Sequence, residues 1–143
     1  MKRIIIIVGF LLFAVNLFSQ VENKKDSLYQ EQWPEFPGGD DSLFTFIENN
    51  LQYPKSAIER MLEGKIYVLF IINEDGKISD AEIEKSKFTV NKKHKKDLKE
   101  AKISMESEAL RIVSSFKYWK PGTINGKIVK SKYLLPITFS LRD

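Results

Sequence analysis

The sequence predicts an α+β domain whose small antiparallel three-stranded sheet, a β-hairpin plus a C-terminal strand, packs against helices in the order α-α-β-β-α-β. Two observations carry this prediction. Apolar residues alternate along residues 65–73, directly before Asp75-Gly76, a pair typical of a tight hairpin turn. Apolar residues then recur at helical spacing over residues 98–116, and a further strand pattern follows over 128–141. One hairpin and one late strand, without repeating strand–helix units, indicate an α+β fold.

Two shorter helices are predicted before the hairpin. Residues 43–51 carry apolar side chains at helical spacing, and the acidic and hydroxyl residues at 40–42 suit its N-cap. A second helix is expected to open at Pro54 and to stop at Gly64, because proline is favoured at the first helical position and glycine just past the last.

The two hairpin strands differ in their expected exposure. Both faces of residues 65–73 are apolar, which indicates a central strand or one with something packed over each face. Residues 77–85 alternate unevenly with charges, so the second strand should be more exposed and bulged. Asn125-Gly126 turns the chain into the last strand. With the last helix placed on the face of the first strand, the residues expected to be buried are Val68, Phe70, Phe116 and Trp119.

The N-terminus has the pattern of an export signal. Lys2 and Arg3 precede an apolar run over residues 4–18, which ends at the small residue Ser19. The alternative is an uncleaved N-terminal helix that anchors the chain in a membrane, although a comfortable span needs about 20 apolar residues. In both cases the rest of the chain lies outside the cytoplasm. The predicted division is a signal peptide over 1–19, a short flexible linker over 20–33 and one domain over 34–143.

Composition excludes several classes of function. The net charge is +4, but Lys2 and Arg3 supply two of the positive charges, and the chain after residue 19 has 21 basic and 19 acidic residues. The protein is therefore not expected to bind nucleic acid. The absence of cysteine excludes disulfides, thiolate nucleophiles and cysteine-rich zinc sites.

No residue pattern indicates catalysis, and we expect a protein that is not an enzyme and has no catalytic residues, metal site or cofactor. His94 is the only histidine, and the lysines on both sides of it disfavour metal binding. Ser114-Ser115 lacks the glycine pattern of a nucleophile elbow. The carboxylate pairs have structural explanations. Asp40-Asp41 and Glu106/Glu108 are expected at helix starts, where the helix dipole favours acidic residues, and Glu82/Glu84 on the solvent-exposed face of a strand.

The segment 92–102 is rich in lysine. Charge runs of this kind are usually solvated, and this is the interpretation we adopt. Binding to anionic lipid or to peptidoglycan is the alternative.

Two stretches together have the order and spacing of a known domain family. The first is PEFPGGDDSLFTFIENNLQYPKSA, followed by Glu63-Gly64, an alternating strand, Asp75-Gly76 and a second strand that closes on Ser86. The second is the ending WKPGTINGKIVKSKYLLPITFSL. Together they resemble the C-terminal domain of TonB proteins over roughly three quarters of the chain.

The resemblance implies a periplasmic module of Gram-negative bacteria that binds a short peptide segment of an outer-membrane receptor by adding it as a strand to its sheet. A full transducer also has an inner-membrane helix coupled to a motor and a long proline-rich spacer. This chain departs from that plan, because residues 20–33 contain no proline. At 3.3–3.6 Å per extended residue the linker reaches about 50 Å, which is short for bridging a periplasm.

The last strand is the expected binding edge. Pro136 cannot donate a ladder hydrogen bond and is tolerated mainly at an edge, while Lys130 and Lys132 alternate as edge-protecting charges do. Strand addition requires such an edge. An ordinary protected edge is the alternative, and self-pairing into a homodimer is a further one. The predicted partner-binding residues are Ile128, Val129, Lys130, Ser131, Lys132, Tyr133, Leu134 and Leu135.

Three functions remain distinct at this point. The first is an exported binding module linked to TonB-dependent transmembrane transport, with an outer-membrane receptor or envelope protein as its partner. The second is a short transducer anchored in the inner membrane by its N-terminal helix and coupled to motor proteins there. The third is a small envelope enzyme, which the missing nucleophile and ligand sets argue against.

Overall fold

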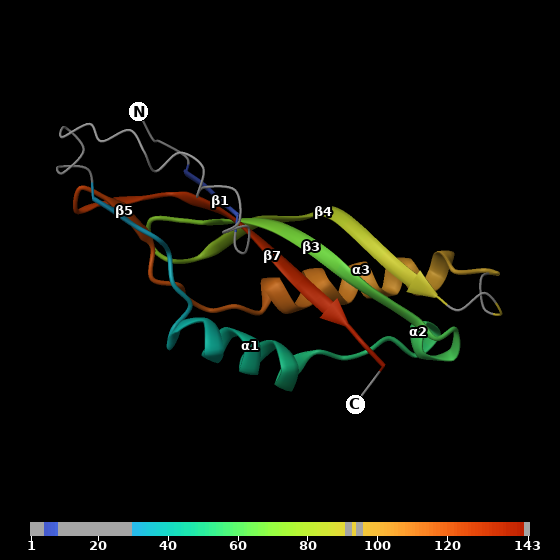
Figure 1. Cartoon of the computed structure of the whole chain (residues 1–143). Coiled ribbons are helices and arrows are strands. Elements are labelled where there is room, and N and C mark those ends of the chain that lie inside the picture. Colours follow the sequence, from blue (N-terminus) through green and yellow to red (C-terminus); the bar gives the residue numbers. More distant parts are fainter. Residues whose placement is uncertain (1–4, 9–29, 91–92, 94–95, 142–143) are drawn as a thin grey trace, which may run out of the picture.

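The computed structural model describes residues 5–8, 30–90, 93 and 96–141, and it confirms the α+β class. A twisted sheet has helices on one face (Figure 1), and the described residues form ten helices and strands. These are β1 (Ile5–Val8), β2 (Glu31–Gln32), α1 (Gly39–Asn50), α2 (Lys55–Glu59), β3 (Leu62–Ile72), β4 (Ile78–Val90), α3 (Lys99–Ser114), β5 (Gly122–Ile124), β6 (Lys127–Val129) and β7 (Ser131–Phe139).

The main sheet has the strand order β1-β7-β3-β4. β3 pairs antiparallel with β4 on one side and with β7 on the other. It is therefore the central strand of the three, as the sequence predicts for a strand apolar on both faces. Two register shifts interrupt the β3–β4 pairing, so the bulged second strand is also confirmed. A fourth strand, β1, pairs in parallel with the outer side of β7, which the sequence did not predict.

A second, smaller sheet has the order β2-β5-β6 and corrects two expectations. The last strand, predicted without interruption over 128–141, is divided at Lys130 into β6 and β7. Asn125 and Gly126, both with positive φ, form the turn that joins β5 to β6. Glu31–Gln32, assigned to the linker, form β2 and pair with β5.

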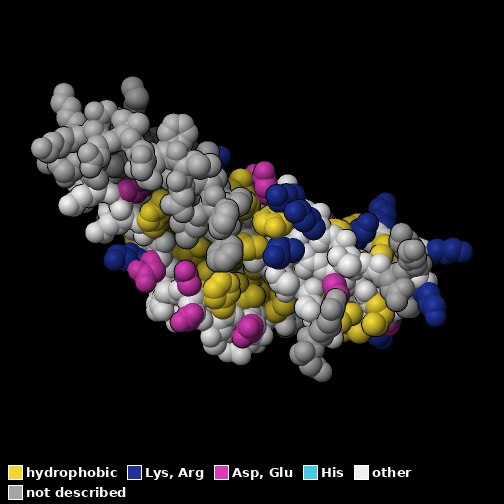
Figure 2. All heavy atoms as spheres, in the orientation of Figure 1, with side chains coloured by type: hydrophobic (Ala, Val, Ile, Leu, Met, Phe, Trp, Pro, Cys, Tyr) yellow, Lys and Arg dark blue, Asp and Glu magenta, His cyan; other side chains and the backbone are white. Residues whose placement is uncertain are grey.

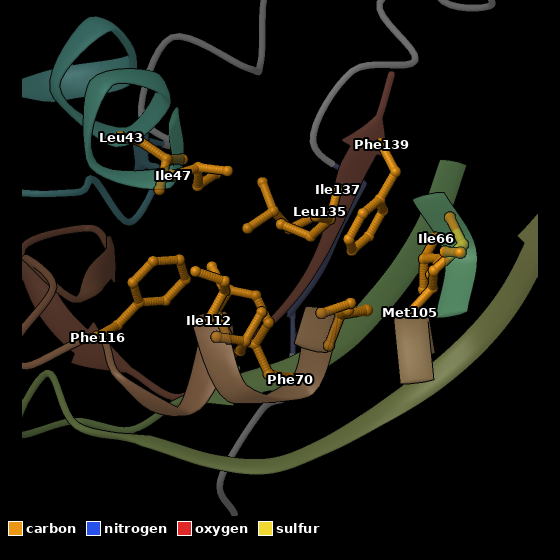
Figure 3. Close-up of a cluster of buried hydrophobic side chains, with 14 of the residues drawn as sticks. Leu43, Ile47, Ile66, Phe70, Met105, Ile112, Phe116, Leu135, Ile137 and Phe139 are labelled. Atoms are coloured by element: carbon orange, nitrogen blue, oxygen red, sulfur yellow. The ribbon is translucent and has the colours of Figure 1, made fainter. Parts of the chain in front are cut away.

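One hydrophobic core lies between the sheet and the helices α1 and α3. Figure 3 shows buried side chains of α1, α3, β3 and β7 meeting in a single cluster. Alternate residues of β3, including Val68 and Phe70, and of β7, including Leu135, point into this cluster. The opposite face of β3, at Tyr67 and Leu69, is only half-buried. The helices therefore cover one face of the sheet.

An aromatic cluster fills the end of the core near the β3–β4 turn. Phe70, Phe116 and Trp119 lie 5.7–6.1 Å apart between ring centroids, mostly edge to face. Tyr133 lies 4.9 Å from Trp119 and joins the cluster to β7. The exposed fraction is 6% or less for Phe70, Phe116, Trp119 and Val68, which confirms the predicted core.

The hairpin turn is fixed against this cluster by Gly76. Its φ is +81°, and a Cβ atom there would lie 2.3 Å from the backbone oxygen of Trp119. The Trp119 N–H donates a 2.9 Å hydrogen bond to the Gly76 oxygen. The Asp75-Gly76 signal therefore marks a close backbone approach as well as a turn.

Helix ends differ from the predictions. α1 begins at Gly39 after a left-handed Gly38, and the Ser42 hydroxyl donates to the Gly38 oxygen, so none of residues 40–42 is the N-cap. α2 ends at Glu59, and Gly64 lies inside β3 rather than after a helix. The long helix ends at Ser114, and its start at Lys99 agrees with the predicted backward extension. The predictions for His94 lie outside the described residues.

Candidate functional site: the outer edge of β7

The outer edge of β7 is set by its pairing with β3. That pairing runs from Ser131 opposite Ile72 to Phe139 opposite Gly64 without a register shift. Backbone N–H groups alternate in direction along an antiparallel strand. Pro136 has no N–H and sits opposite Tyr67 within the unbroken ladder, which indicates that its nitrogen faces away from β3.

The same alternation gives the direction of the other backbone N–H groups of β7. Lys132 and Leu134 share the parity of Pro136, so their N–H groups point to the outer edge, while those of Ser131 and Tyr133 point to β3. An added strand would therefore accept hydrogen bonds from Lys132 and Leu134.

Side chains of the predicted partner-binding residues divide into two sets. Ser131 and Leu135 are buried, and Tyr133 packs on Phe70 and Trp119, so these three belong to the core. Lys132 and Leu134 point to the half-covered opposite face. Selectivity at this edge would thus involve the side chains of Lys132 and Leu134, whereas the inward set holds the strand in place.

The remaining predicted residues lie apart from this edge. Ile128 and Val129 belong to β6 and pair with β5 in the small sheet, and Lys130 falls between the two strands. The structure therefore brings Ser131, Lys132, Tyr133, Leu134 and Leu135 together on one strand, and it separates the first three predicted residues from them.

The outer edge of β7 accepts a parallel strand in this structure. Ile5–Val8 of the same chain pair with Ser131–Leu134, residue for residue. These four residues lie within the predicted signal peptide. This outer edge thus has the backbone geometry to receive an extended apolar segment, here one from the N-terminus (Figure 1).

Asp40 affects Tyr133 of β7 electrostatically, a relation that local sequence patterns do not indicate. Burial raises the pKa of Tyr133, and the negative charge of Asp40 adds to that effect. The sequence indicates for Asp40 only a place in a helix start. Its effect on Tyr133 depends on how α1 packs on β7, which no local sequence signal reports.

Comparisons with known proteins agree on one family. Residues 49–90, from the end of α1 to the end of β4, match the sequence profile described as Gram-negative bacterial TonB protein C-terminal. A solution structure of the Helicobacter pylori TonB C-terminal domain, residues 194–285, is 30% identical; the match covers 72% of this chain and 94% of that one, with a TM-score of 0.47. This chain belongs to the TonB C-terminal domain family.

A longer form of the same Helicobacter pylori domain, residues 179–285, is 26% identical and gives a TM-score of 0.50. That match covers 75% of this chain and 88% of the other. None of the curated proteins matches this chain.

A second candidate site in this TonB-family chain is an open hollow between α3 and the segment after α1. It measures about 510 Å³, and Tyr53, Ile103 and Glu108 are among the residues lining it. Both Glu108 carboxylate oxygens accept hydrogen bonds from Arg111, at 2.6 and 2.8 Å, and Oε1 also accepts the Gln52 N–H at 2.7 Å.

These partners decide the charge of Glu108. Burial alone would raise its pKa, but the hydrogen bonds from Arg111 and Gln52 outweigh burial and hold the pKa below its usual value. A carboxylate kept ionised by two donors is poorly suited to act as a general acid. Arg111 also donates to the Asn50 oxygen at 2.7 Å, so the pair ties the segment after α1 to α3.

Replacing Glu108 with Gln should make stability less sensitive to acid. A lowered folded-state pKa stabilises the fold above the unfolded pKa of about 4.3, and this contribution is lost as pH falls through the folded value. Urea unfolding of the wild type should therefore lose stability below about pH 4.5 more steeply than Glu108→Gln does. Glu48→Gln, on the exposed surface of α1, should follow the wild type. Equal acid sensitivity in Glu108→Gln and the wild type would contradict a structural ion pair.

Among the residues that the structure describes, no group of three or more His, Cys, Asp or Glu side chains is placed to hold a metal ion. Within the same residues, no helix has the length and apolar content of a membrane span.

Proposed function

We propose that this protein is an exported TonB-like binding module that recognises a peptide segment of an outer-membrane transporter or related envelope protein by β-strand addition, in support of TonB-dependent transmembrane transport. The observation that carries the proposal is the outer edge of β7, where an extended segment pairs with Ser131–Leu134. Main-chain hydrogen bonds give affinity in this mode of binding, and flanking side chains give selectivity.

Family membership supports a protein partner. TonB C-terminal domains are periplasmic parts of energy transducers that interact with outer-membrane transporters, and they are not enzymes. The ion-paired Glu108 in the hollow beside α3 agrees with this non-catalytic function.

The proposal includes removal of residues 1–19. The segment Ile5–Val8 occupies the same part of β7 that the partner peptide would use. Cleavage after Ser19 would therefore release the edge at the time when the protein reaches the periplasm. An uncleaved chain would have to move this segment away before a partner could bind.

A photo-crosslinking amino acid at Lys132 tests the proposal in cells. Side chains on adjacent strands lie about 4.5–5.5 Å apart, so a peptide added to β7 is within reach of this position. We expect capture of an outer-membrane or envelope protein through one short segment. The intact mass of the captured chain should correspond to a start at Gln20.

The matched control places the crosslinker at Glu82 on β4, the opposite edge of the sheet. Capture of the same partner from both positions would argue against strand addition at β7. A chain that retains residues 1–19 and captures only inner-membrane proteins would favour the anchored transducer instead.

A further inference from the structure

Positive charge is concentrated at one end of this domain. Residues 85–102 contain eight lysines and two acidic residues, a net charge of +6, whereas the whole chain has +4. The rest of the chain is therefore negative on balance. Four of the described lysines of this region lie near the end of β4, just before α3 or in its first turn, and we call these four, Lys87, Lys96, Lys99 and Lys102, the basic end.

Of these four lysines, Lys102 interacts within the fold, because its Nζ lies 5.3 Å from the centroid of the Phe88 ring. Among the described residues, no ion pair joins a lysine of the basic end to a carboxylate, and the nearby Asp97 pairs with Arg60 at 3.6 Å. Lys87 lies directly opposite Lys65 across the β3–β4 ladder. Like charges directly opposite each other destabilise a sheet. An anionic partner would therefore reduce a repulsion between Lys65 and Lys87 that remains in the folded domain.

Exposed aliphatic side chains accompany the lysines. Ile58, Met61 and Ile103 are 46%, 53% and 52% exposed, and they lie on α2, in the turn after it and on the first turns of α3. The Arg60 Nε donates to the Asp97 oxygen at 2.8 Å, which fixes α2 beside the start of α3. Figure 2 shows dark-blue and yellow side chains together at this end of the molecule.

We propose that the basic end binds a membrane surface that contains anionic lipid. Lysines beside an anionic surface each contribute to attraction, and exposed aliphatic side chains insert at the boundary between headgroups and acyl chains. A sugar polymer would be better matched by flat aromatic rings. The exposed Trp33 and Tyr118 lie elsewhere, in the segments that bracket the small sheet.

The basic end and residues Ser131–Leu134 of β7 lie at opposite ends of β3. Leu62 pairs with Val90 at the basic end, and Ile72 pairs with Ser131 at the other. Ten residue steps along a strand correspond to about 33 Å. A domain held on a membrane by its basic end would therefore leave Ser131–Leu134 free to face a protein partner. The two proposals can fail independently.

A fluorophore at Ile103 tests the inference. The chain has no cysteine, so Ile103→Cys labelled with an environment-sensitive dye reports a single position. We expect a blue shift with vesicles of equimolar phosphatidylcholine and phosphatidylglycerol, but not with phosphatidylcholine alone, and its reversal at high salt. Ile128→Cys, 54% exposed at the far end of the domain, should not respond. Both cysteine variants have the same N-terminus, so any difference between them reports the labelled position.

Charge reversal at the basic end is the second part of the test. Lys87→Glu, Lys96→Glu and Lys99→Glu together should raise the lipid concentration for half-maximal shift at least about tenfold. The same lysines changed to Gln, a milder alteration that keeps the test valid if the reversed protein misfolds, should weaken binding to a smaller extent. The control carries three exposed lysines from elsewhere changed to Glu, namely Lys77, Lys117 and Lys127, and should bind like the parent.

Three results would overturn the inference: an equal shift with neutral vesicles, an equal shift at Ile128, or unchanged binding after both sets of substitutions. A shift at Ile103 with peptidoglycan fragments but not with vesicles would assign the basic end to that polymer instead.

Discussion

Phe70→Ala is expected to lower the free energy of unfolding by about 3–5 kcal/mol, the range for truncating a buried aromatic side chain. Phe70 is fully buried on the central strand, and its ring lies 5.5 Å from Tyr133, 5.7 Å from Trp119 and 6.1 Å from Phe116. Alanine would leave a cavity where α3, β3 and β7 meet. Urea unfolding followed by circular dichroism measures the loss.

Phe44→Ala is the matched control. Phe44 lies on α1 and is 51% exposed, so the same truncation removes little buried area. Its effect should stay within about 0.5 kcal/mol, and the good helix propensity of alanine offsets part of the loss. A Phe44 effect as large as that of Phe70 would mean that the core is placed wrongly.

Long, strongly patterned elements could be predicted from the sequence. β3 alternates from Lys65 to Ile72, α3 repeats its apolar spacing over several turns, and Asp75-Gly76 marks the turn between the hairpin strands. The core residues followed from the same patterns. The small sheet could not be predicted, because β2, β5 and β6 have only two or three residues each, too few to show a period.

Glycine positions explain two of the errors. The sequence predicts that a helix stops at Gly64, but Gly64 lies in β3, where a Cβ atom would approach the Lys87 backbone oxygen to 2.8 Å. A glycine required for close packing and a glycine that stops a helix look alike in sequence. Gly38, in contrast, has a left-handed φ of +86° and is the N-cap of α1, the position expected of an acidic or hydroxyl side chain.

The candidate site was predicted only in part. Pro136 and the lysines indicated an edge strand, and β7 has an outer edge that a strand can join. The inward direction of Ser131, Tyr133 and Leu135 depends on register with β3, and a shift by one residue would reverse it. The pairing of Ile5–Val8 with β7 joins segments more than 120 residues apart, for which local patterns give no signal.

Lys132→Pro is expected to weaken binding of a captured partner peptide at least about tenfold, whereas Lys132→Ala should change it less than about threefold. The Lys132 amide faces the outer edge, so proline removes a donor that an added strand would use. It removes no hydrogen bond to β3, because Lys132 has the parity of the native Pro136. Alanine keeps the amide and deletes only the side chain.

Tyr133→Pro is the control for the effect of proline on folding. The Tyr133 amide faces β3 opposite Phe70, so proline there should break the ladder and unfold the domain, while Lys132→Pro should keep the circular dichroism of the wild type. Binding is then compared in the folded variants by titration with the peptide, and hydrogen exchange at Leu134 should slow when the peptide is added. If Lys132→Pro stays folded and binds the peptide as tightly as Lys132→Ala does, the partner does not use the outer edge of β7.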